Sequence, residues 1–166
     1  ITKGTPVVTD IIPAEGITNE RLIMLAAALE GKSEHPLAKA IVDEWNDNPA
    51  YSDARKANDI SVTQFQAAPG HGRSGGVEGI AMVGGNREYI SESANITDGL
   101  GAQADMLAEQ GKTPMFFASK PESGNGKVLG IIAVADVVKE ESRKAIEEMQ
   151  KMGLSVVMLT GDNERT

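Results

Sequence analysis

The sequence predicts an α+β domain, an antiparallel sheet flanked by helices, inserted into part of an α/β domain. The middle of the chain alternates short apolar and polar runs with glycine-rich turns, which is typical of antiparallel strands. Near the end, a helix over residues 139–152 leads into the unbroken apolar segment 156–159. A strand that is apolar on both faces is expected inside a parallel sheet covered by helices, so the last part of the chain differs in plan from its middle.

Composition and charge exclude several classes of protein. The 166 residues suffice for one ordinary domain, or for a small domain and part of another. Acidic residues number 24 and basic residues 16, and the net charge of −8, without a basic stripe, argues against a nucleic-acid partner. The absence of cysteine removes disulfides and thiolate metal sites. The longest apolar run, residues 22–29, is far shorter than the roughly 20 residues of a membrane-spanning helix, so we expect this part of the protein not to span a membrane.

The first elements are a strand and a helix. Residues 5–12 are rich in β-branched side chains and are closed by Pro13, which predicts a short strand. Apolar residues then recur at helical spacing over residues 19–30. Thr18 is a suitable N-cap for this helix, and Gly31 is suited to end it.

A second helix is predicted over residues 36–46, because Pro36 fits the first helical turn and apolar residues then fall on one face. Residues 46–59 are polar and contain one proline and one large apolar residue. We expect this segment to be an exposed, mobile connection without chemistry.

The middle of the chain predicts two strands and a loop. Residues 60–67 alternate apolar and polar side chains, and residues 77–83 do so less regularly. Residues 69–76 between them are rich in glycine and are expected to form a hairpin-like loop.

Two helices and two strands complete the predicted α+β domain. The helices cover residues 87–91 and 98–109, and the strands cover residues 115–119 and 127–135. Turn-forming residues 121–126 join the two strands.

The first candidate for chemistry is Thr160-Gly161-Asp162. It directly follows the buried strand 156–159, at the carboxyl end where open α/β sheets bind ligands. Gly-Asp is also a common turn pair, so the spacing alone favours a plain turn for this tripeptide.

A second candidate is the glycine-rich segment that begins with Gly70 and Gly72. Glycine has no Cβ, so the backbone there can closely approach a flat ring or a phosphate. A flexible hairpin explains the same glycine density. The chain lacks a Gly-x-x-x-x-Gly-Lys-Ser/Thr motif, so a nucleotide would be held in some other way.

A third candidate is the segment between the first two predicted helices. His35 stands at the start of the second helix, where its imidazole could stack on an aromatic base. Glu30, at the end of the preceding helix, could accept a hydrogen bond from an exocyclic amine. The alternative is an interhelical turn with a capping histidine and a solvated glutamate.

Together these segments resemble a known family. Ser33-Glu34-His35-Pro36-Leu37, Gly70-x-Gly72, Gly85-Asn86 and Thr160-Gly161-Asp162-Asn163 succeed one another in the order and at the separations of the large cytoplasmic loop of the heavy-metal-transporting (type IB) P-type ATPases. The opening Ile1-Thr2-Lys3-Gly4 looks like the segment directly after that family's Asp-Lys-Thr-Gly-Thr phosphorylation signature. The resemblance covers the whole chain and is greatest to the copper(I) pumps.

The resemblance implies the site residues and their ligands. The adenosine of ATP would be bound by Glu30, His35, Gly70, Gly72, Gly85 and Asn86. The phosphorylation domain would contribute Thr160, Gly161 and Asp162, near the γ-phosphate and its Mg²⁺. No residue of the chain is expected to bind a metal ion directly.

The resemblance also implies the domain organisation and the partners. Residues 12–130 would be the nucleotide-binding domain, and residues 1–11 and 131–166 would be flanking parts of a haloacid-dehalogenase-like phosphorylation domain. Residues 10–13 and 130–133 are hinge candidates, because the chain would pass there twice between the domains. The partners would be ATP and the remaining domains of the pump, namely the transmembrane domain, the actuator domain and the rest of the phosphorylation domain. The chain would thus be a cytoplasmic domain of an integral membrane protein.

Three departures from the family pattern limit what this chain would do alone. The aspartate that becomes phosphorylated would lie just before Ile1, and the family's later Gly-Asp-Gly-x-Asn-Asp segment would lie beyond Thr166. We therefore expect the chain to bind ATP and barely hydrolyse it. Arg73 follows the Gly-x-Gly where the family usually has an aliphatic residue, which adds a cation near the nucleotide.

Two other functions are compatible with the sequence. A haloacid-dehalogenase-type phosphatase with a large cap would share the Thr160-Gly161-Asp162 strand end. A non-enzymatic module that senses nucleotide would share the predicted adenosine site. A transmembrane helix with Cys-Pro-Cys or a similar motif upstream would distinguish a pump from both.

Overall fold

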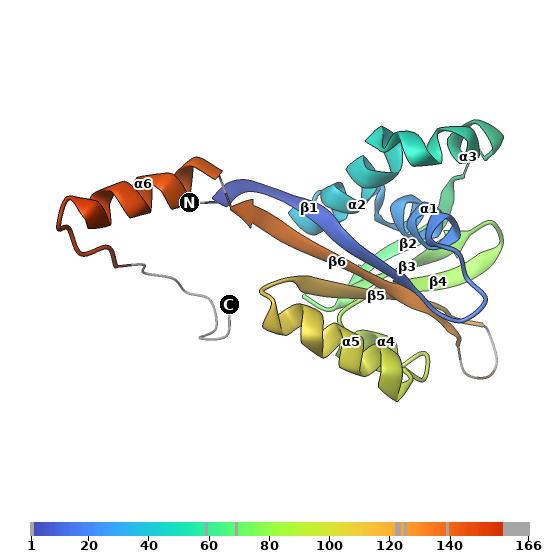
Figure 1. The fold of residues 1–166 in the computed structure, drawn as a ribbon. Coiled ribbons are helices and arrows are strands. Elements are labelled where there is room, and N and C mark those ends of the chain that lie inside the picture. Colours follow the sequence, from blue (N-terminus) through green and yellow to red (C-terminus); the bar gives the residue numbers. More distant parts are fainter. Residues whose placement is uncertain are drawn as a thin grey trace.

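The fold is a single antiparallel sheet between two helical layers (Figure 1). The structure is a computed structural model, which describes residues 2–58, 60–68, 70–121, 124, 126–138 and 140–157. The six strands lie in the order β1-β6-β5-β4-β3-β2, and each neighbouring pair is antiparallel. The strands are β1 (Thr2–Pro13), β2 (Val62–Ala68), β3 (Gly72–Val77), β4 (Ile80–Gly85), β5 (Thr113–Ser119) and β6 (Val128–Val138). The predicted α+β class is confirmed.

Local sequence signals set the ends of the helices. The helices are α1 (Asn19–Glu30), α2 (Pro36–Asp47), α3 (Ser52–Ala57), α4 (Arg87–Ser91), α5 (Asp98–Glu109) and α6 (Glu140–Lys151), with a 3-10 turn η1 (Pro49–Tyr51) before α3. Thr18 caps α1 as expected, since its Oγ1 accepts a hydrogen bond from the backbone N–H of Arg21 at 3.1 Å. Gly31 ends this helix with φ of −60°, so the termination does not use the left-handed conformation open to glycine.

The two helical layers pack on opposite faces of the sheet. Helices α1 and α2 cover one face, and α4 and α5 cover the other (Figure 1). Consecutive strand residues serve the two faces in turn, because side chains alternate along a strand. Thus Phe117 and Ile132 face α1, whereas Phe116 and Ile131 face α4 and α5.

The prediction that residues 46–59 form a mobile connection is wrong, because this segment contains η1 and α3. The Trp45 and Tyr51 rings stack with centroids 5.6 Å apart. The Arg55 guanidinium donates hydrogen bonds to the backbone carbonyls of Trp45 and Asn48 at the end of α2. These contacts give the polar segment a fixed packing partner that its composition does not reveal.

The prediction of a hairpin-like loop over residues 69–76 is also wrong, because residues 72–77 form strand β3 in the interior of the sheet. The reversal after β3 lies at Glu78 and Gly79, which have φ of 50° and 75°. The glycines serve close strand packing, since a Cβ added at Gly75 would lie 2.7 Å from Val62 Cγ2. At the neighbouring Gly76 it would lie 2.6 Å from Thr63 Oγ1.

Strands β1 and β6 form a long ribbon that extends from the sheet toward α6 (Figure 1). The hinge candidates 10–13 and 130–133 are paired with each other in this ribbon, from Asp10 opposite Ala133 to Pro13 opposite Gly130. A register irregularity lies beside them, between Val8 and Asp10. A hinge at this point would therefore bend a paired ribbon and not two separate loops.

Of the predicted strand 156–159, the structure describes residues 156 and 157, and these two residues do not form a strand. Residues 156 and 157 have no regular structure, and Val157 is 81% exposed because no described strand lies beside it. Residues 158–159 and the candidate residues Thr160, Gly161 and Asp162 lie outside the described part of the chain. None of the helices in the described ranges combines the length and the hydropathy of a membrane span.

Candidate functional site

Most of the predicted adenosine-site residues line one cavity at the end of the sheet. The cavity has a volume of about 310 Å³ and lies where the start of α2, the β2–β3 turn, the end of β4 and the start of β5 meet. Five of the six predicted residues line it: His35, Gly70, Gly72, Gly85 and Asn86. The sheet register explains this convergence, because Gly72 pairs directly with Gly85.

His35 is the N-cap of α2, in agreement with its predicted place at the start of that helix. Its Nδ1 accepts a hydrogen bond from the backbone N–H of Leu37 at 3.2 Å. In this tautomer the other ring nitrogen, Nε2, carries the proton and can donate. The residue is exposed at the cavity, so its ring can serve both as a cap and as a stacking surface.

Gly72 and Gly85 are required by packing behind the cavity. A Cβ added at Gly72 would lie 2.4 Å from the Tyr89 ring, and one added at Gly85 would lie 2.4 Å from the carbonyl oxygen of His71. Tyr89 is not one of the residues that line the cavity. The two glycines therefore let α4 and the β2–β3 turn approach the strands closely. Gly70 has a different role, because its φ of 78° is needed by the turn itself.

Asn86 connects the cavity to α4. Its side-chain Oδ1 accepts a hydrogen bond from the backbone N–H of Tyr89 at 2.9 Å, so the residue is the N-cap of α4. Its own backbone N–H donates to the carbonyl of His71 at 3.0 Å. The cap uses one of the two lone pairs of the amide oxygen, and the side-chain NH₂ can donate to a ligand.

Glu30 is the predicted residue that the structure does not bring to the cavity wall. Its side chain is fully buried, and Arg73 Nη1 lies 2.7 Å from its Oε2. Neither carboxylate oxygen has a hydrogen bond of good geometry among the described residues, so the contact is mainly one of charge. Burial raises the pKa of Glu30, and the Arg73 charge opposes this rise. A solvated glutamate, the alternative considered from the sequence, is excluded.

The cavity also contains residues that the motifs did not indicate. They are Ala67, Ala68, His71, Thr113, Pro114 and Met115. Leu37, from the Ser-Glu-His-Pro-Leu motif, and Arg73, the expected cation, also line the cavity. His71 lies inside the glycine-rich segment, so its position between Gly70 and Gly72 could have indicated it. The β5 residues carry no local signal, because the sheet order alone brings β5 beside β4.

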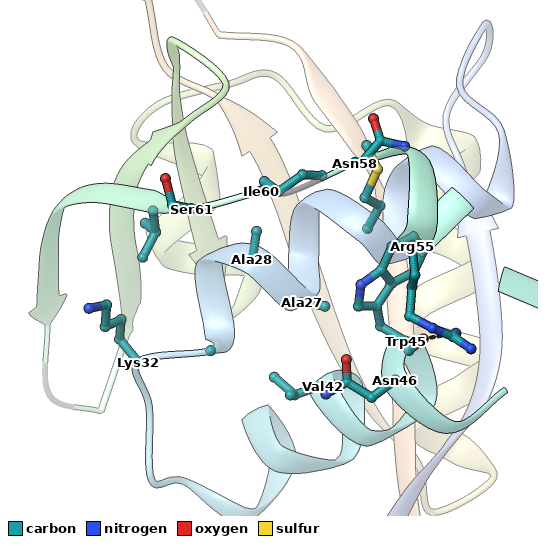
Figure 2. Close-up of a pocket in the computed structure, with 13 residues that line it drawn as sticks. Ala27, Ala28, Lys32, Val42, Trp45, Asn46, Arg55, Asn58, Ile60 and Ser61 are labelled. Carbon is teal, nitrogen blue, oxygen red and sulfur yellow. Dashed lines mark hydrogen bonds between the residues drawn. The ribbon is translucent and has the colours of Figure 1, made fainter. Parts of the chain in front are cut away.

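A second hollow, of about 500 Å³, lies between α1, α2, α3 and the start of β2. Figure 2 shows Trp45 and Arg55 at one end of it and Lys32 at the other. The Arg55 guanidinium lies 5.9 Å from the centre of the Trp45 ring and is already hydrogen-bonded to backbone carbonyls. None of the predicted site residues lines this hollow. We therefore place the candidate site in the cavity that contains His35 and Asn86.

The described residues hold no cluster suited to a metal ion. Within the described ranges, no three or more histidine, aspartate and glutamate side chains lie close enough together to bind one. The predicted Thr160, Gly161 and Asp162 lie outside those ranges. The cavity wall presents the exposed His35 and the Asn86 amide, and the described residues assign no group to phosphate chemistry.

Comparisons with a family model and with curated proteins assign the chain to the same family. The model of the haloacid dehalogenase-like hydrolase family matches residues 1–166. A probable copper-importing P-type ATPase A of Enterococcus hirae is 42% identical over 165 residues, which are 99% of this chain and 20% of that protein. A copper-exporting P-type ATPase of Bacillus subtilis is 38% identical over 168 residues, which are 100% of this chain and 19% of that protein. The chain thus spans about a fifth of the length of the curated relatives that it matches.

Solved structures share the fold. A zinc-transporting PIB-type ATPase in its E2.Pi state is 31% identical, with a TM-score of 0.78 over 99% of this chain and 24% of that chain. The N-domain of HMA6, a copper-transporting P-type ATPase, is 24% identical, with a TM-score of 0.57 over 79% of this chain and 96% of that chain. The second likeness concerns the fold alone.

Proposed function

Since the chain belongs to the haloacid dehalogenase-like hydrolase family and is similar over its whole length to copper-transporting P-type ATPases, we propose that it is the nucleotide-binding domain of a heavy-metal pump, with flanking parts of the phosphorylation domain. The nucleotide-binding domain would be residues 12–130, and the flanking parts would be residues 1–11 and 131–166. One observation carries this proposal. Five residues of the predicted adenosine site, from three separate segments of the chain, line the same cavity.

The cavity has the size and the chemistry for a nucleoside. Its volume of about 310 Å³ is at the lower end of the roughly 300 to 1,000 Å³ typical of small-molecule pockets. This volume suits a base and a ribose, with the phosphates outside the cavity. The exposed His35 ring supplies a stacking surface, and the Asn86 amide supplies a donor at the rim.

The phosphates would be used outside the described part of the chain. The nucleotide-binding domain would deliver the γ-phosphate of ATP to an aspartate upstream of Ile1, near Thr160, Gly161 and Asp162. The Mg²⁺ that accompanies ATP would compensate the charge of the triphosphate during transfer. The chain alone would bind ATP and barely hydrolyse it, because the proposed nucleophile would lie upstream of Ile1.

The transported ion and the partners are inferred from the relatives. Those relatives include copper-importing and copper-exporting pumps, so copper(I) is the proposed cargo. The partners of the chain would be the transmembrane domain, the actuator domain and the rest of the phosphorylation domain. The chain would then be a cytoplasmic domain of a membrane pump, and a hinge in the β1–β6 ribbon would couple ATP delivery to the membrane path.

The proposal is tested by titrating the chain with ATP while amide NMR shifts are followed. We expect shifts at His35, Gly70, Gly72, Gly85 and Asn86, with free triphosphate as the control for non-specific anion binding. His35→Ala removes both the ring and the N-cap, whereas His35→Asn keeps a capping oxygen and removes only the ring. Both variants should lose about 1 to 3 kcal/mol of binding free energy, the range for stacking of a base on an aromatic side chain.

The two variants separate the roles of His35. If His35→Asn binds ATP as tightly as the wild type while His35→Ala does not, the residue acts only as a cap and the stacking role is wrong. If saturating ATP shifts none of the cavity residues, the proposed function is wrong and the family likeness reports the fold alone.

A further inference from the structure

One ion pair joins two of the segments that line the cavity. Glu30 is the last residue of α1, and Arg73 is the second residue of β3. Nη1 of Arg73 lies 2.7 Å from Oε2 of Glu30. His35 follows Glu30 within the turn between α1 and α2, and Gly72 directly precedes Arg73 at the end of the β2–β3 turn. The pair therefore lies next to both turns.

The close packing of α1 on the sheet explains why Glu30 needs a partner. A Cβ added at Gly75 or at Gly84 would lie 3.3 or 3.0 Å from the Leu29 side chain, so these glycines let the end of α1 approach β3 and β4. The Glu30 side chain is fully buried there. A buried carboxylate is costly unless a cation compensates its charge. Because side chains alternate along a strand, Arg73 lies on the same face of β3 as Gly75 and supplies this cation.

Hydrogen bonds connect Glu30 to His35. The backbone N–H of Ser33 donates to the Glu30 carbonyl at 2.8 Å, and the backbone N–H of His35 donates to Ser33 Oγ at 3.2 Å. Nδ1 of His35 in turn accepts from the N–H of Leu37 in the first turn of α2. The segment is thus bonded from the end of α1 to the start of α2, and a displacement of Glu30 would displace His35.

The sheet fixes the other partner of the ion pair. Arg73 is paired with Ala67 on β2 and with Gly84 on β4. Two residues earlier, the carbonyl of His71 accepts a hydrogen bond from the backbone N–H of Asn86 at 3.0 Å. The backbone of Arg73 is therefore held by strands on both sides, and its side chain extends from this fixed point to the carboxylate at the end of α1.

Such a pair is better suited to positioning than to stabilising the fold. Replacing a buried ion pair by apolar side chains is often neutral for stability, because the cost of desolvation offsets the attraction between the charges. We propose that Arg73 is a positioning residue, whose ion pair with Glu30 holds the turn that carries His35 against the turn that carries Gly70 and Gly72. The effect on ATP binding rests on the proposed function, whereas the effect on the free chain does not.

The first test follows amide hydrogen exchange of the nucleotide-free chain. Arg73→Met removes the charge and keeps a long, unbranched side chain. We expect the Ser33 amide of this variant to exchange faster by about fivefold or more, relative to the amide of Ile132 in the middle of the sheet. Arg73→Lys retains a cation and should keep the wild-type ratio of the two exchange rates. A wild-type ratio in Arg73→Met would overturn the inference.

The second test measures ATP binding by isothermal titration. Arg73→Met should raise the Kd of ATP by about fivefold or more, because His35 is no longer held in place before the ligand arrives. Arg73→Lys should bind ATP within about twofold of the wild type. A Kd that is unchanged or smaller in Arg73→Met would contradict the positioning role.

Arg21 provides a matched control in the same helix. Its Nη2 lies 2.6 Å from Oε2 of Glu78, so this pair also joins α1 to the sheet, at the turn after β3. Arg21 does not line the cavity. Arg21→Met should change neither the exchange ratio nor the Kd of ATP. Equal effects of Arg21→Met and Arg73→Met would show that any anchor of α1 suffices and would overturn the specific role of Arg73.

A further variant covers the case in which Arg73→Met does not fold, because it leaves the buried Glu30 carboxylate without its cation. Glu30→Leu/Arg73→Met removes both charges, and it should fold and still show the faster exchange of Ser33. Exchange of Ser33 at the wild-type ratio in this double variant would contradict the inference. If the wild-type chain does not bind ATP in the cavity, the proposed function is wrong, and the exchange of Ser33 still decides the role of Arg73.

Discussion

Glu30 is the only charged residue that is fully buried in the described part of the chain. Its raised pKa means that the folded protein binds a proton more tightly there than the unfolded chain does. The folded state is therefore favoured by this residue at low pH. As the pH rises from the ordinary value of 4.5 through the raised pKa of the folded state, that contribution is lost.

We predict that Glu30→Gln removes this pH dependence. The amide resembles the protonated acid, so the variant and the wild type should be closest in stability near pH 4. The free energy of unfolding of the variant should then rise relative to that of the wild type as the pH is raised to 8. Urea denaturation at several pH values measures the difference in unfolding free energy between the variant and the wild type. If this difference became smaller as the pH increased, the burial of the carboxylate would be contradicted.

At the scale of single residues, the sequence predicted which residues belong to the candidate site but did not predict the contacts that they make. His35, Gly70, Gly72, Gly85 and Asn86 were found because they belong to short motifs with recognisable spacing, although their binding role stays a prediction. The pairing of Glu30 with Arg73 could not be found in this way. It depends on which face of β3 turns toward α1, and this is fixed by the strand register.

At the scale of elements, Gly85 shows how tightly β3, β4 and α4 are packed. An added Cβ would lie 2.4 Å from the carbonyl oxygen of His71 and 2.7 Å from Cα of Gly72, and both neighbours are backbone atoms that a rotamer change cannot move. We predict that Gly85→Ala lowers the free energy of unfolding by about 1 to 3 kcal/mol, the usual cost of overpacking.

A glycine in α5 provides the opposite case. A Cβ added at Gly101 would meet nothing within 4 Å, and the residue is helical. Gly101→Ala should therefore raise stability by about 0.5 to 1 kcal/mol, because alanine loses less backbone entropy in a helix. Urea denaturation of both variants measures these changes, and a Gly85→Ala protein as stable as the wild type would disprove the packing argument.

Elements with a strong local signal were predicted within a few residues, and elements defined by distant contacts were not. The bounds of α1, α4 and α5 match the predictions because caps and apolar spacing lie within each segment. Strand β3 was taken for a loop because its glycines are explained only by the neighbouring strands that approach them. Helix α3 was missed because its stability comes from Arg55 and Tyr51 contacting α2.

At the scale of the whole molecule, one ion pair joins segments that are far apart in the sequence. Lys112 Nζ donates to Asp10 Oδ2 at 2.8 Å, which connects the hinge region of β1 to the segment before β5 across strand β6. The hydrogen bond from Lys112 lowers the pKa of Asp10 below its ordinary value of 3.8. The stabilisation is therefore present above pH 3.8 and is lost as the pH falls through the lower pKa of the folded state.

We predict that Asp10→Asn lowers the free energy of unfolding at pH 7 by less than about 1 kcal/mol, since the pair is partly exposed to solvent. The loss should shrink at high salt and below pH 3. Asp53→Asn is a suitable control, because Asp53 and its partner Lys56 are both largely exposed and their pair should contribute nothing measurable. An equal loss at pH 7 and pH 2 would rule out a charge effect at Asp10.

The overall class and the family were the most predictable features. The antiparallel sheet with helices on both faces is confirmed, and the resemblance to the heavy-metal pumps is confirmed by relatives at 36–42% identity. The α/β part at the end of the chain was predicted from the apolar segment 156–159, whose side chains would be buried in a larger sheet. The described residues contain no such sheet beyond β6, so Val157 stands in solvent.

The pairing of β1 with β6 has a mechanical consequence. Thr2 lies opposite Val138, so the outer ends of the two strands leave the ribbon side by side. Ladder hydrogen bonds in an antiparallel pair are perpendicular to the strands. A force that separates these two ends therefore acts in the unzipping geometry and loads the hydrogen bonds one after another. In the shear geometry, the force would load all the hydrogen bonds of the ladder at once. The ribbon would yield to a small pulling force even where its equilibrium stability is high.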